Sequence, residues 1–399
     1  MKILIVSQYA QPTGFSRVTR LLAAAFADLF ETHVLGIDVY ADAAGENIRY
    51  KVHCNPFSLD VFAEQTIVKV VDEILPDIVI LYHDPWLLHR FLVPMRSCHH
   101  RCRKIGYIPV DGYILQSYVF DDITELDALV AFTSFGREVL TNGMKSLGRN
   151  HLPPVAEIPH GVAASFYPLN DKIEQVDERR QLARAYLFPH KPALWDGFWV
   201  LNANKNQPRK RLDISLEGFA LFARDKPPNV KFFLHSAWKS RHLDIYKLIT
   251  RLQIAKRVIS TESGTDQPSL PVSSLNYIYN ACDVGINTSL GEGWGLVSVE
   301  HAATGAPQVV PDHSASKEIW KATASLLPVR RVCYGSGLLQ GGEVSAADVA
   351  EALDKLYTDK SYYRDKLMAC YQKSRDSRFT MHEIADRWNR LFFEITSDK

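Results

Sequence analysis

Short apolar runs and longer amphipathic segments alternate through the first part of the chain. The apolar runs predict strands at Ile3–Val6, His33–Val39, Ile78–Tyr82, Ile105–Val110, Leu129–Phe132 and Val155–Ile158. Between the runs, apolar residues recur at helical spacing, as they do at Val18, Leu21, Leu22, Ala25, Phe26 and Leu29. Repeated strand–helix–strand units favour a mainly parallel sheet that is covered by helices on both faces.

The same alternation begins again after a break. A polar, charged stretch follows His160-Gly161 and places a domain boundary near residues 162–172. Beyond it, strands are predicted at Phe198–Asn202, Val230–His235, Val258–Ser260, Val284–Asn287 and Gln308–Val310. Helices are predicted at Leu212–Arg224, Leu275–Ala281, Val297–Ala303 and Ala346–Tyr357. We therefore expect two doubly wound α/β domains, over residues 1–165 and 170–378, with a ligand site in the cleft between them.

The last predicted helix, residues 380–399, carries a complete start signal. Thr380 and Glu383 have the spacing of a capping box, and Phe379 and Ile384 have that of a hydrophobic staple. The apolar face of this helix consists of Ile384, Trp388, Leu391, Phe392 and Ile395. A face of this size must pack against another surface, and we expect it to dock on the N-terminal domain.

Composition and charge narrow the class of protein. The 399 residues are 46% apolar and 23% charged, which are globular values that exclude a disordered or fibrous chain. The 46 basic and 45 acidic residues give a net charge of +1, and this balance argues against nucleic acid as the main partner. Six cysteines in a chain of this length are typical of a reduced, cytoplasmic protein.

A membrane-spanning segment is not expected. Met1-Lys2 and a short apolar run predict a strand rather than a signal peptide. No apolar run approaches the roughly 18 residues that a span requires, so any membrane contact would be peripheral. The basic stretch Arg96–Lys104 could touch an anionic acceptor or a membrane surface, or be a solvated helix end. Its two cysteines have no second pair downstream, which disfavours a zinc site.

The segment Thr288–Pro307 carries the strongest chemical signal. Three glycines, at 291, 293 and 295, lie between a predicted strand and a predicted helix and would let the backbone approach a ligand closely. The start of the helix would offer free N–H groups to a phosphate. Glu292 and Glu300 would lie on the order of 10 Å apart if most of the segment is helical. A structural strand–turn–helix with two incidental carboxylates is the alternative.

These residues resemble the Glu-x7-Glu signature of the retaining GT-B glycosyltransferases of family 4. Tyr279-Asn-Ala-Cys-Asp283 and Pro307-Gln-Val-Val resemble further motifs of that family. The resemblance covers both halves and the final helix, and is greatest to glycosyltransferases of large algal viruses and bacteria. It implies a GT-B fold, in which two Rossmann-like domains face a cleft and the C-terminal helix crosses back to the N-terminal domain.

The resemblance also implies an activity and a donor site. The activity is transfer of a sugar from a GDP- or UDP-sugar to an acceptor hydroxyl, in glycan biosynthesis, with formation of an α-glycosidic bond. Glu300 would hold the ribose hydroxyls and Glu292 the hydroxyls of the donor sugar. The diphosphate would be bound by the N–H groups of Gly293, Trp294, Gly295 and Leu296. A glycan or a lipid-linked molecule would be the acceptor.

A basic segment, Asn202–Arg211, follows another predicted strand. Its four cations would lie at a helix N-terminus, where the macrodipole is positive and repels them. A bound anion would offset this repulsion. A solvated turn is the alternative. The segment resembles the family's Gly-Arg-x4-Lys pattern, which grips the donor phosphates. Lys210 matches the lysine, Lys205 stands where the arginine is usual, and Arg209 or Arg211 could compensate. Because no Asp-x-Asp or metal-ligand cluster is present, we expect no metal and no cofactor, and the nucleotide-sugar donor is a substrate.

Two more candidates lie in the first domain. Gln11–Arg17 resembles the family's glycine-rich first loop, which faces the donor diphosphate, but it has only Gly14 and could be a tight turn. At the end of a predicted strand, many relatives have a histidine followed by an aspartate. This chain has Val110 and then Asp111, which becomes the candidate contact to acceptor or donor hydroxyls, with a strand-end turn as the alternative.

The sequence also bears on three other functions. A sugar-nucleotide-binding protein with little turnover is consistent with the departures at Lys205, Val110 and Asp111. A GT-B epimerase or phosphorylase would use the same fold, but no pyridoxal lysine or phosphate pocket can be identified. An NAD-dependent oxidoreductase is excluded because no Gly-x-Gly-x-x-Gly follows any strand.

Overall fold

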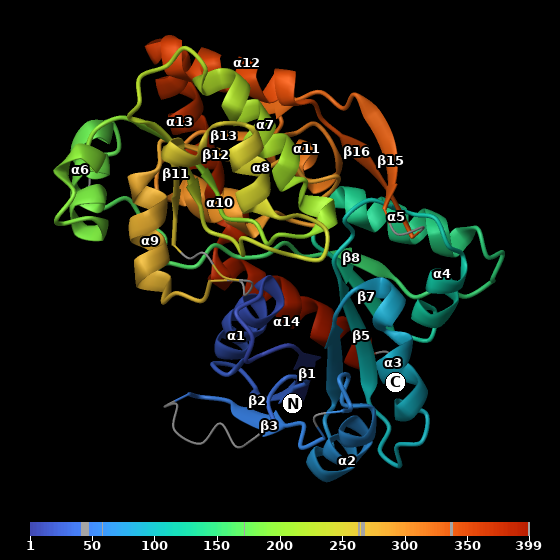
Figure 1. Ribbon diagram of the computed structural model, residues 1–399. Helices are drawn as coiled ribbons and strands as arrows, with labels where there is room; N and C mark the ends of the chain where they lie inside the picture. The colour runs from blue at the N-terminus through green and yellow to red at the C-terminus, as the bar shows by residue number, and fades with distance from the viewer. Residues whose placement is uncertain are drawn as a thin grey trace. The chain divides into compact units, whose positions relative to one another are not determined.

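The computed structural model describes residues 1–40, 48–57, 59–170, 172–261, 264, 268–335 and 338–397. The chain separates into two compact units (Figure 1): Met1–Gly161 with Ser377–Lys399, called the N-terminal unit, and Val162–Asp376, called the C-terminal unit. Residue 171, inside the predicted boundary 162–172, and residues 398 and 399 of the predicted final helix lie outside the described residues.

The N-terminal unit is built on a parallel sheet of seven strands. Their order across the sheet is β3 (Lys51–Cys54), β2 (Glu31–Gly36), β1 (Lys2–Ser7), β4 (Ile78–Tyr82), β5 (Arg103–Ile108), β7 (Ala128–Ala131) and β8 (Val155–Glu157). Every neighbouring pair is parallel. The predicted strands are thus present, with ends that differ by a few residues. Strand β3 was not predicted, because this edge strand is only half-buried and lacks a continuous apolar run.

Helices connect and cover these strands. They are α1 (Gly14–Phe26), α2 (Glu64–Ile74), α3 (His89–Met95), α4 (Tyr118–Ile123), α5 (Ser134–Lys145) and α14 (Met381–Ser397), and a two-residue strand, β6, spans Tyr113–Ile114. The side chain of Thr13 caps α1 and that of Thr133 caps α5, each accepting a hydrogen bond from a backbone N–H in the first turn. Helix α1 follows the carboxyl end of β1 after a six-residue loop, and α5 follows that of β7 after two residues.

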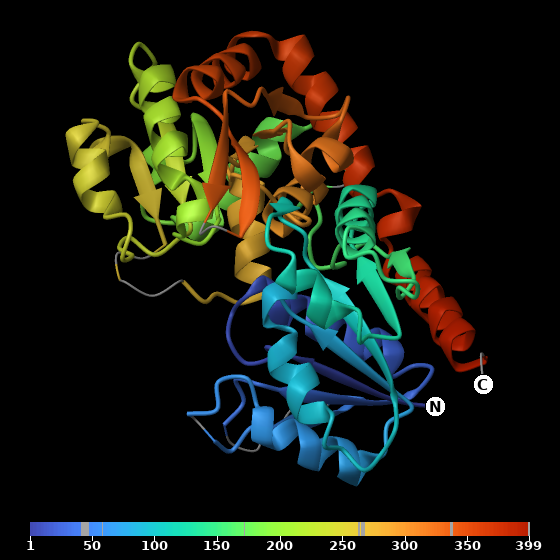
Figure 2. The same ribbon diagram turned by 90° about the vertical axis from the view of Figure 1, so that its right-hand side faces the viewer.

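The final helix, α14, belongs to the N-terminal unit, as its apolar face predicted. Its five predicted apolar residues are all buried. The ring centroid of Phe26, at the end of α1, lies 5.7 Å from that of Trp388 and 5.3 Å from that of Phe392. Figures 1 and 2 show α14, in red, alongside α1, in blue. Thr380 Oγ1 accepts a hydrogen bond from Glu383 N at 3.3 Å, but the Glu383 carboxylate contacts Arg387 at 2.9 Å instead of closing the capping box.

The C-terminal unit has a second parallel sheet, of six strands. Their order is β11 (Val258–Ser260), β10 (Val230–Leu234), β9 (Phe198–Asn202), β12 (Val284–Ile286), β13 (Gln308–Pro311) and β14 (Ser325–Leu327). The helices are α6 (Val176–Leu187), α7 (Leu212–Ala223), α8 (Ile245–Arg251), α9 (Val272–Ala281), α10 (Leu296–Ala303), α11 (Ser314–Trp320), α12 (Ala346–Thr358) and α13 (Lys360–Ser374). Strands β15 (Arg331–Gly335) and β16 (Leu339–Glu343) form an antiparallel hairpin. The two sheets confirm the predicted pair of doubly wound, Rossmann-like domains.

Helix α6 contains three buried arginines, which attach it to the C-terminal unit. Arg179 and Arg180 donate to the carbonyl of Gly305 at 2.9 and 3.0 Å. Arg184 Nη2 donates to Asp283 Oδ2 at 2.6 Å, and the same carboxylate oxygen accepts from Trp199 N at 2.7 Å. Asp283 therefore joins α6 to the start of β9.

No helix in the described ranges combines the length and the apolar character that crossing a membrane requires.

Candidate functional site

The loop between β12 and α10 begins the candidate site in the C-terminal unit. It leaves the carboxyl end of β12 and includes Gly291, Gly293 and Gly295. Gly295 has a φ of 90°, in the left-handed region that glycine adopts without strain, and α10 starts at the next residue. Within the described ranges, the N–H groups of Gly295 and Leu296 donate to no backbone or side-chain oxygen. This helix start can therefore present donors to an anion.

Glu292 lies in this loop and is 4% exposed. Its Oε1 atom is 2.5 Å from Lys210 Nζ and accepts hydrogen bonds from Asn287 Nδ2 at 3.0 Å and Ser289 Oγ at 2.7 Å. Its Oε2 atom is 3.3 Å from Arg209 Nη1. Arg209 Nη1 also donates to the carbonyl of Gly291. A buried carboxylate is thus held between two cations, which keep it charged in a place where an unpaired charge would be unstable.

The electrostatic balance at Glu292 favours the carboxylate form. Burial by itself would raise its pKa, but the charges of Lys210 and Arg209 and the hydrogen bonds from Lys210 and Asn287 outweigh burial and lower the pKa to about 2. Glu292 is therefore ionised across the physiological pH range. It can accept hydrogen bonds from hydroxyls, but it cannot supply a proton as a general acid.

The segment after β9 is held against the same loop. Leu290 N donates to the carbonyl of Arg209 at 2.8 Å, and Thr288 Oγ1 donates to that of Arg211 at 2.7 Å. Thr288 Oγ1 also lies 2.7 Å from Ser215 Oγ in α7, which in turn accepts from Asn202 Nδ2 at 2.9 Å. These contacts join the ends of β9 and β12 and the start of α7, so the position of Lys210 relative to Glu292 is fixed by the fold.

Glu300, the second carboxylate of the signature, is in α10 and is 3% exposed. Its Oε2 atom accepts a hydrogen bond from the hydroxyl of Tyr279 in α9 at 3.2 Å. The ring of Tyr279 is stacked against Phe166 with a centroid distance of 5.4 Å. Tyr279 therefore orients Glu300, a role that the sequence pattern did not assign to it.

The other basic candidate, Lys205, is placed differently. It is exposed in the loop after β9, and its side chain makes no hydrogen bond or ion pair with any described residue. Arg209, expected only to compensate for it, is the second cation at Glu292. Arg211 instead pairs with Asp213 at 2.9 Å and with Glu343. Of the four cations in this segment, the structure therefore brings Arg209 and Lys210 to the carboxylate.

Sequence reasoning missed Ser314 as a member of this site. Ser314 Oγ accepts a hydrogen bond from Glu292 N at 3.0 Å, and Ala315 N donates to the carbonyl of Glu292 at 3.2 Å. Ser314 has a φ of 50°, which is unusual for a residue with a side chain. The serine was visible in the sequence, but its hydrogen bond with Glu292 N was not.

Gly14 and Asp111 belong to the N-terminal unit, and both follow carboxyl ends of its strands. Gly14 is the exposed first residue of α1. The loop before it is held by Asp38, whose carboxylate accepts from the N–H groups of Tyr9 at 2.7 Å and Gln11 at 2.8 Å. Asp111 is half-buried after β5. It is close enough to Tyr82, at the end of β4, to contribute with burial to the raised pKa of that phenol.

The basic stretch Arg96–Lys104 is partly neutralised in the structure. Arg96 pairs with Glu125, and Arg103 pairs with Asp127 at 2.8 Å. His99 and His100 both donate backbone N–H groups to Asp72. Among the described residues, no group of three or more histidine, cysteine or acidic side chains could hold a metal ion. The stretch therefore presents less positive charge than its sequence suggests.

Buried histidines predict that both units lose stability in acid. Burial lowers the pKa of His160 and of His301 to about 3, and that of His83 to about 4. Since an unfolded histidine has a pKa near 6.5, the unfolded state takes up protons first as the pH falls below that value. Each of these groups should cost about 1 kcal/mol per pH unit below 6.5, until its folded pKa is reached.

Urea unfolding at pH 7.5, 6.5, 5.5 and 4.5 measures this dependence. The midpoint should fall steadily below pH 6.5, and His160→Gln should have a smaller pH dependence than the wild type. His190→Gln, at an exposed position, is the matched control and should keep the wild-type dependence. A midpoint that stays constant down to pH 4.5 would contradict the prediction.

Comparisons with known proteins place this geometry in context. No protein-family model matches the chain. Over 273 residues it is 29% identical to the D-inositol 3-phosphate glycosyltransferase of Stackebrandtia nassauensis, a match that covers 66% of this chain and 53% of that protein. The chain thus matches about half the length of this curated relative.

Solved structures resemble the chain over its whole length. HepE of Anabaena, in complex with UDP and glucose, matches with a TM-score of 0.72 and 16% identity, covering 99% of this chain and 100% of that one. Sucrose-phosphate synthase of Thermosynechococcus elongatus matches with a TM-score of 0.74 and 14% identity, covering 100% of each chain. At this level of identity the likeness shows the fold, which is of the GT-B type.

Proposed function

We propose that this chain is a retaining glycosyltransferase that moves a sugar from a UDP- or GDP-sugar to an acceptor hydroxyl, with formation of an α-glycosidic bond. The observation that carries the proposal is the buried Glu292 carboxylate, held between Lys210 and Arg209 directly before the start of α10. The curated relative is named as a glycosyltransferase, and HepE has been crystallised with UDP-glucose, both of which support it.

The donor would be bound mainly by the C-terminal unit. Glu300, oriented by Tyr279, would accept hydrogen bonds from the ribose hydroxyls. Lys210 and Arg209 would contact the diphosphate, and the N–H groups of Gly293, Trp294, Gly295 and Leu296 would donate to its oxygens. The exposed ammonium group of Lys205 is accessible for a further phosphate contact. Glu292, as a carboxylate, would accept from the hydroxyls of the donor sugar.

The bond changes require positive charge at the leaving group. The bond from the anomeric carbon to the diphosphate breaks, and the acceptor oxygen bonds to that carbon on the same face. The acceptor proton passes to the departing phosphate oxygen, so no protein nucleophile is needed. Lys210, Arg209 and the start of α10 would stabilise the charge that develops on the diphosphate. Because these groups supply the charge, we propose that the reaction is independent of metal ions.

The N-terminal unit would contribute Gly14 and Asp111. Gly14 has no side chain to obstruct a diphosphate at the exposed start of α1. Asp111, half-buried at the end of β5, would accept a hydrogen bond from a donor or acceptor hydroxyl and so position it for attack.

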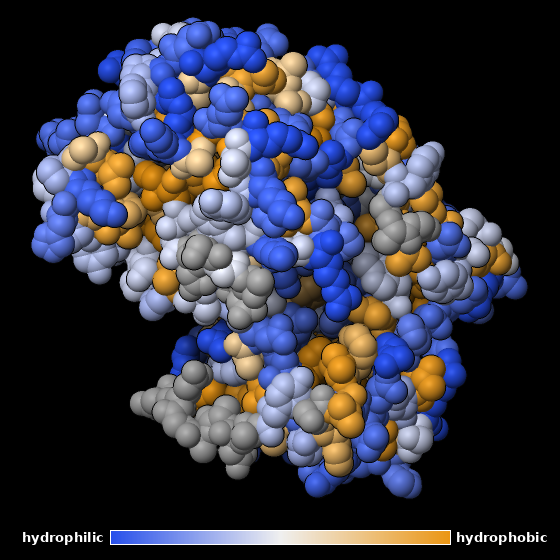
Figure 3. Space-filling view, in the orientation of Figure 1, coloured by the Kyte–Doolittle hydropathy of each residue, from blue (hydrophilic) through white to orange (hydrophobic). Residues whose placement is uncertain are grey.

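The acceptor would be a glycan or a lipid-linked molecule, and the reaction would take place in the cytoplasm. All six cysteines are free, as expected in a reducing compartment. Three apolar residues of the segment after β3 are strongly exposed: Phe57 by 50%, Leu59 by 97% and Val61 by 57%. Figure 3 shows apolar residues, in orange, gathered on the front of the N-terminal unit. This surface supports a peripheral contact with a membrane.

Nucleotide binding tests the proposed function. In the presence of EDTA, one of UDP, GDP and ADP should raise the melting temperature of the wild type, and its sugar conjugates should be hydrolysed slowly. Glu300→Gln should weaken binding of that nucleotide by about 10-fold or more, because it removes charge-assisted hydrogen bonds to the ribose. Glu351→Gln, at an exposed position on α12, is the matched control.

The outcomes separate three possibilities. Binding with turnover supports a transferase, whereas binding without any turnover would favour a sugar-nucleotide-binding protein. Failure of every nucleotide to shift the melting temperature of the wild type would overturn the proposed function.

A further inference from the structure

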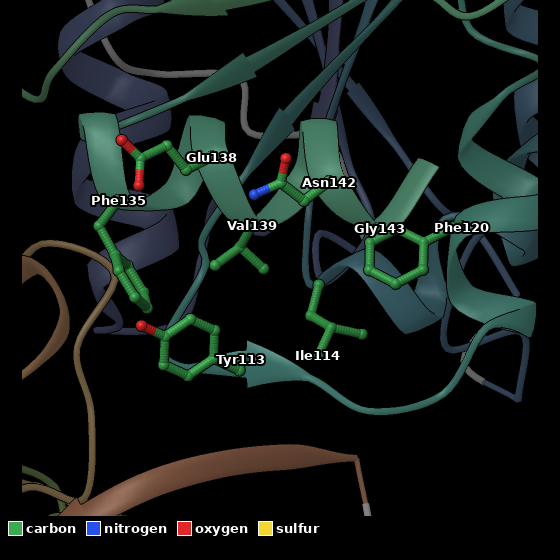
Figure 4. Close-up of a pocket in the computed structure, with 8 residues that line it drawn as sticks. All are labelled: Tyr113, Ile114, Phe120, Phe135, Glu138, Val139, Asn142 and Gly143. Carbon is green, nitrogen blue, oxygen red and sulfur yellow. The ribbon is translucent and has the colours of Figure 1, made fainter. Parts of the chain in front are cut away.

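A pocket lies in the N-terminal unit, and none of its lining residues is among those assigned to the donor. It has a volume of about 200 Å³ and lies between β6 and helices α4 and α5. Figure 4 shows Tyr113 and Ile114 facing Val139 across it, with Phe135 at one end and Phe120 at the other. The pocket is therefore short, with an aromatic ring at each end, and differs from the long channel that an acyl or prenyl chain would need.

The apolar wall of the pocket presents an aromatic ring to solvent. Tyr113 is 50% exposed. Its ring packs edge-on against Phe135 with a centroid distance of 5.2 Å, which holds it in place. The other end depends on Gly143, because a Cβ atom at this position would overlap the ring of Phe120. Glycine thus lets Phe120 close the pocket against α5.

Helix α5 also contributes two polar side chains, Glu138 and Asn142, which Figure 4 shows at the edge of the pocket beyond Val139. Both residues are exposed, and within the described ranges neither side chain makes a hydrogen bond or ion pair. They are four residues apart on one face of the helix, so their Cβ atoms are about 5–6 Å apart. A carboxylate and an amide at this spacing can accept and donate hydrogen bonds to two hydroxyls of one small ring.

We propose that this pocket binds a neutral sugar or cyclitol ring of the acceptor. The apolar face of the ring would lie on Tyr113, and its hydroxyls would reach Glu138 and Asn142. A dry cavity of about 150 Å³ accepts a benzene ring, so about 200 Å³ accommodates one six-membered ring with its substituents. The Glu138 carboxylate disfavours an anionic group, and the rings of Phe135 and Phe120 at the two ends disfavour a long acyl or prenyl chain.

The assignment to the acceptor rests on the proposed function. Tyr113 lies two residues after Asp111, the candidate contact to a reacting hydroxyl, so both belong to the segment that follows β5. A ring held at Tyr113 would give this segment a means of selecting the acceptor as well as contacting it.

Two substitutions on α5 separate pocket binding from general effects on the helix. Asn142→Phe places a ring over the pocket from an exposed position, while Lys145→Phe adds the same bulk to an exposed position that does not line it. Glu138→Gln keeps the shape of the wall and removes its charge. Circular dichroism and melting temperature show whether each variant is folded.

Saturation-transfer NMR measures binding of defined probes: methyl α-glucoside, methyl α-galactoside, methyl α-mannoside, myo-inositol and hexanol. At least one sugar or the cyclitol should give a signal with the wild type and with Lys145→Phe. That signal should fall at least fivefold in Asn142→Phe and at least twofold in Glu138→Gln. A signal from hexanol alone, or a sugar signal that survives in Asn142→Phe, would overturn the proposal.

Kinetics then tests the assignment to the acceptor. With the donor found by the nucleotide screen, Asn142→Phe should hydrolyse the donor at the wild-type rate within twofold, while transfer to the bound probe falls at least tenfold. An equal loss of hydrolysis and transfer would overturn this assignment. Absence of any donor turnover in the wild type would contradict the proposed function instead, and the NMR signal would still test the sugar site.

Discussion

Replacing Asp283 by alanine is expected to destabilise the C-terminal unit by about 3–5 kcal/mol. The Asp283 carboxylate is buried, and its Oδ2 atom accepts hydrogen bonds from Arg184 and from the backbone of Trp199. A second buried guanidinium, that of Arg180, lies 3.6 Å from Oδ1. Alanine would leave both arginines without their counter-charge, and the cost of burying an uncompensated charge accounts for the large effect.

Urea unfolding of the full chain measures this loss. Glu217→Ala is the matched control, because it breaks a solvent-exposed ion pair. The side chain of Glu217 is 39% exposed and that of its partner, Arg251, is 70% exposed. The control should cost less than about 1 kcal/mol. Asp283→Asn keeps an acceptor for Trp199 N and should fall between the two. If Asp283→Ala lowered the free energy of unfolding no more than Glu217→Ala, α6 would not depend on this carboxylate.

Lys210→Met and Glu292→Gln should both slow transfer, but change diphosphate binding in opposite directions. In the structure the Glu292 carboxylate pairs with both cations: its Oε1 atom lies 2.5 Å from Lys210 Nζ, and its Oε2 atom lies 3.3 Å from Arg209 Nη1. A nucleoside diphosphate bound as we propose would have to share these cations with Glu292 or displace it. Removing Lys210 takes away a charge-assisted contact and should weaken binding by about 10-fold or more. Removing the Glu292 charge releases both cations and should strengthen binding severalfold.

The rate of transfer should fall about 10²–10³-fold in both variants, because each removes a group proposed to act on the developing charge or on the sugar. Calorimetry with the nucleoside diphosphate found by the thermal screen gives the affinities, and release of that nucleotide gives the rates. Lys247→Met, at an exposed position on α8, controls for loss of positive charge. Weaker binding in Glu292→Gln, equal to that in Lys210→Met, would show that the carboxylate supports the phosphates rather than competing with them.

The alternation of apolar runs and amphipathic segments was sufficient to predict the fold. Buried parallel strands have no solvent-facing side, so they read as continuous apolar runs that are easily located. Helix α14 was predicted to dock on the N-terminal domain because its wide apolar face had to be buried. Elements that lack such a pattern were missed. The edge strand β3 is half-polar, and the buried positions of α6 include three arginines.

For parts of the candidate site, the sequence indicated which residues take part but not which of them contact one another. The glycines and Glu292 indicated a phosphate-binding loop, but which cation would meet the carboxylate depends on how the end of β9 folds against the end of β12. Ser314 was missed because its role comes from a backbone conformation and one hydrogen bond to Glu292. The assignments of Glu300, Asp111 and Lys205 stay predictions, and Glu300→Gln tests the first of them.

The place of α14 in the N-terminal unit has a consequence for the order in which the chain folds. Translation delivers the strands of that unit first, yet Phe26 meets Trp388 and Phe392 only after the whole of Val162–Asp376 has left the ribosome. The C-terminal unit is continuous in sequence and can fold as soon as it emerges. The first unit to be synthesised is therefore the last to be completed, and the aromatic surface around Phe26 stays uncovered by α14 until synthesis ends.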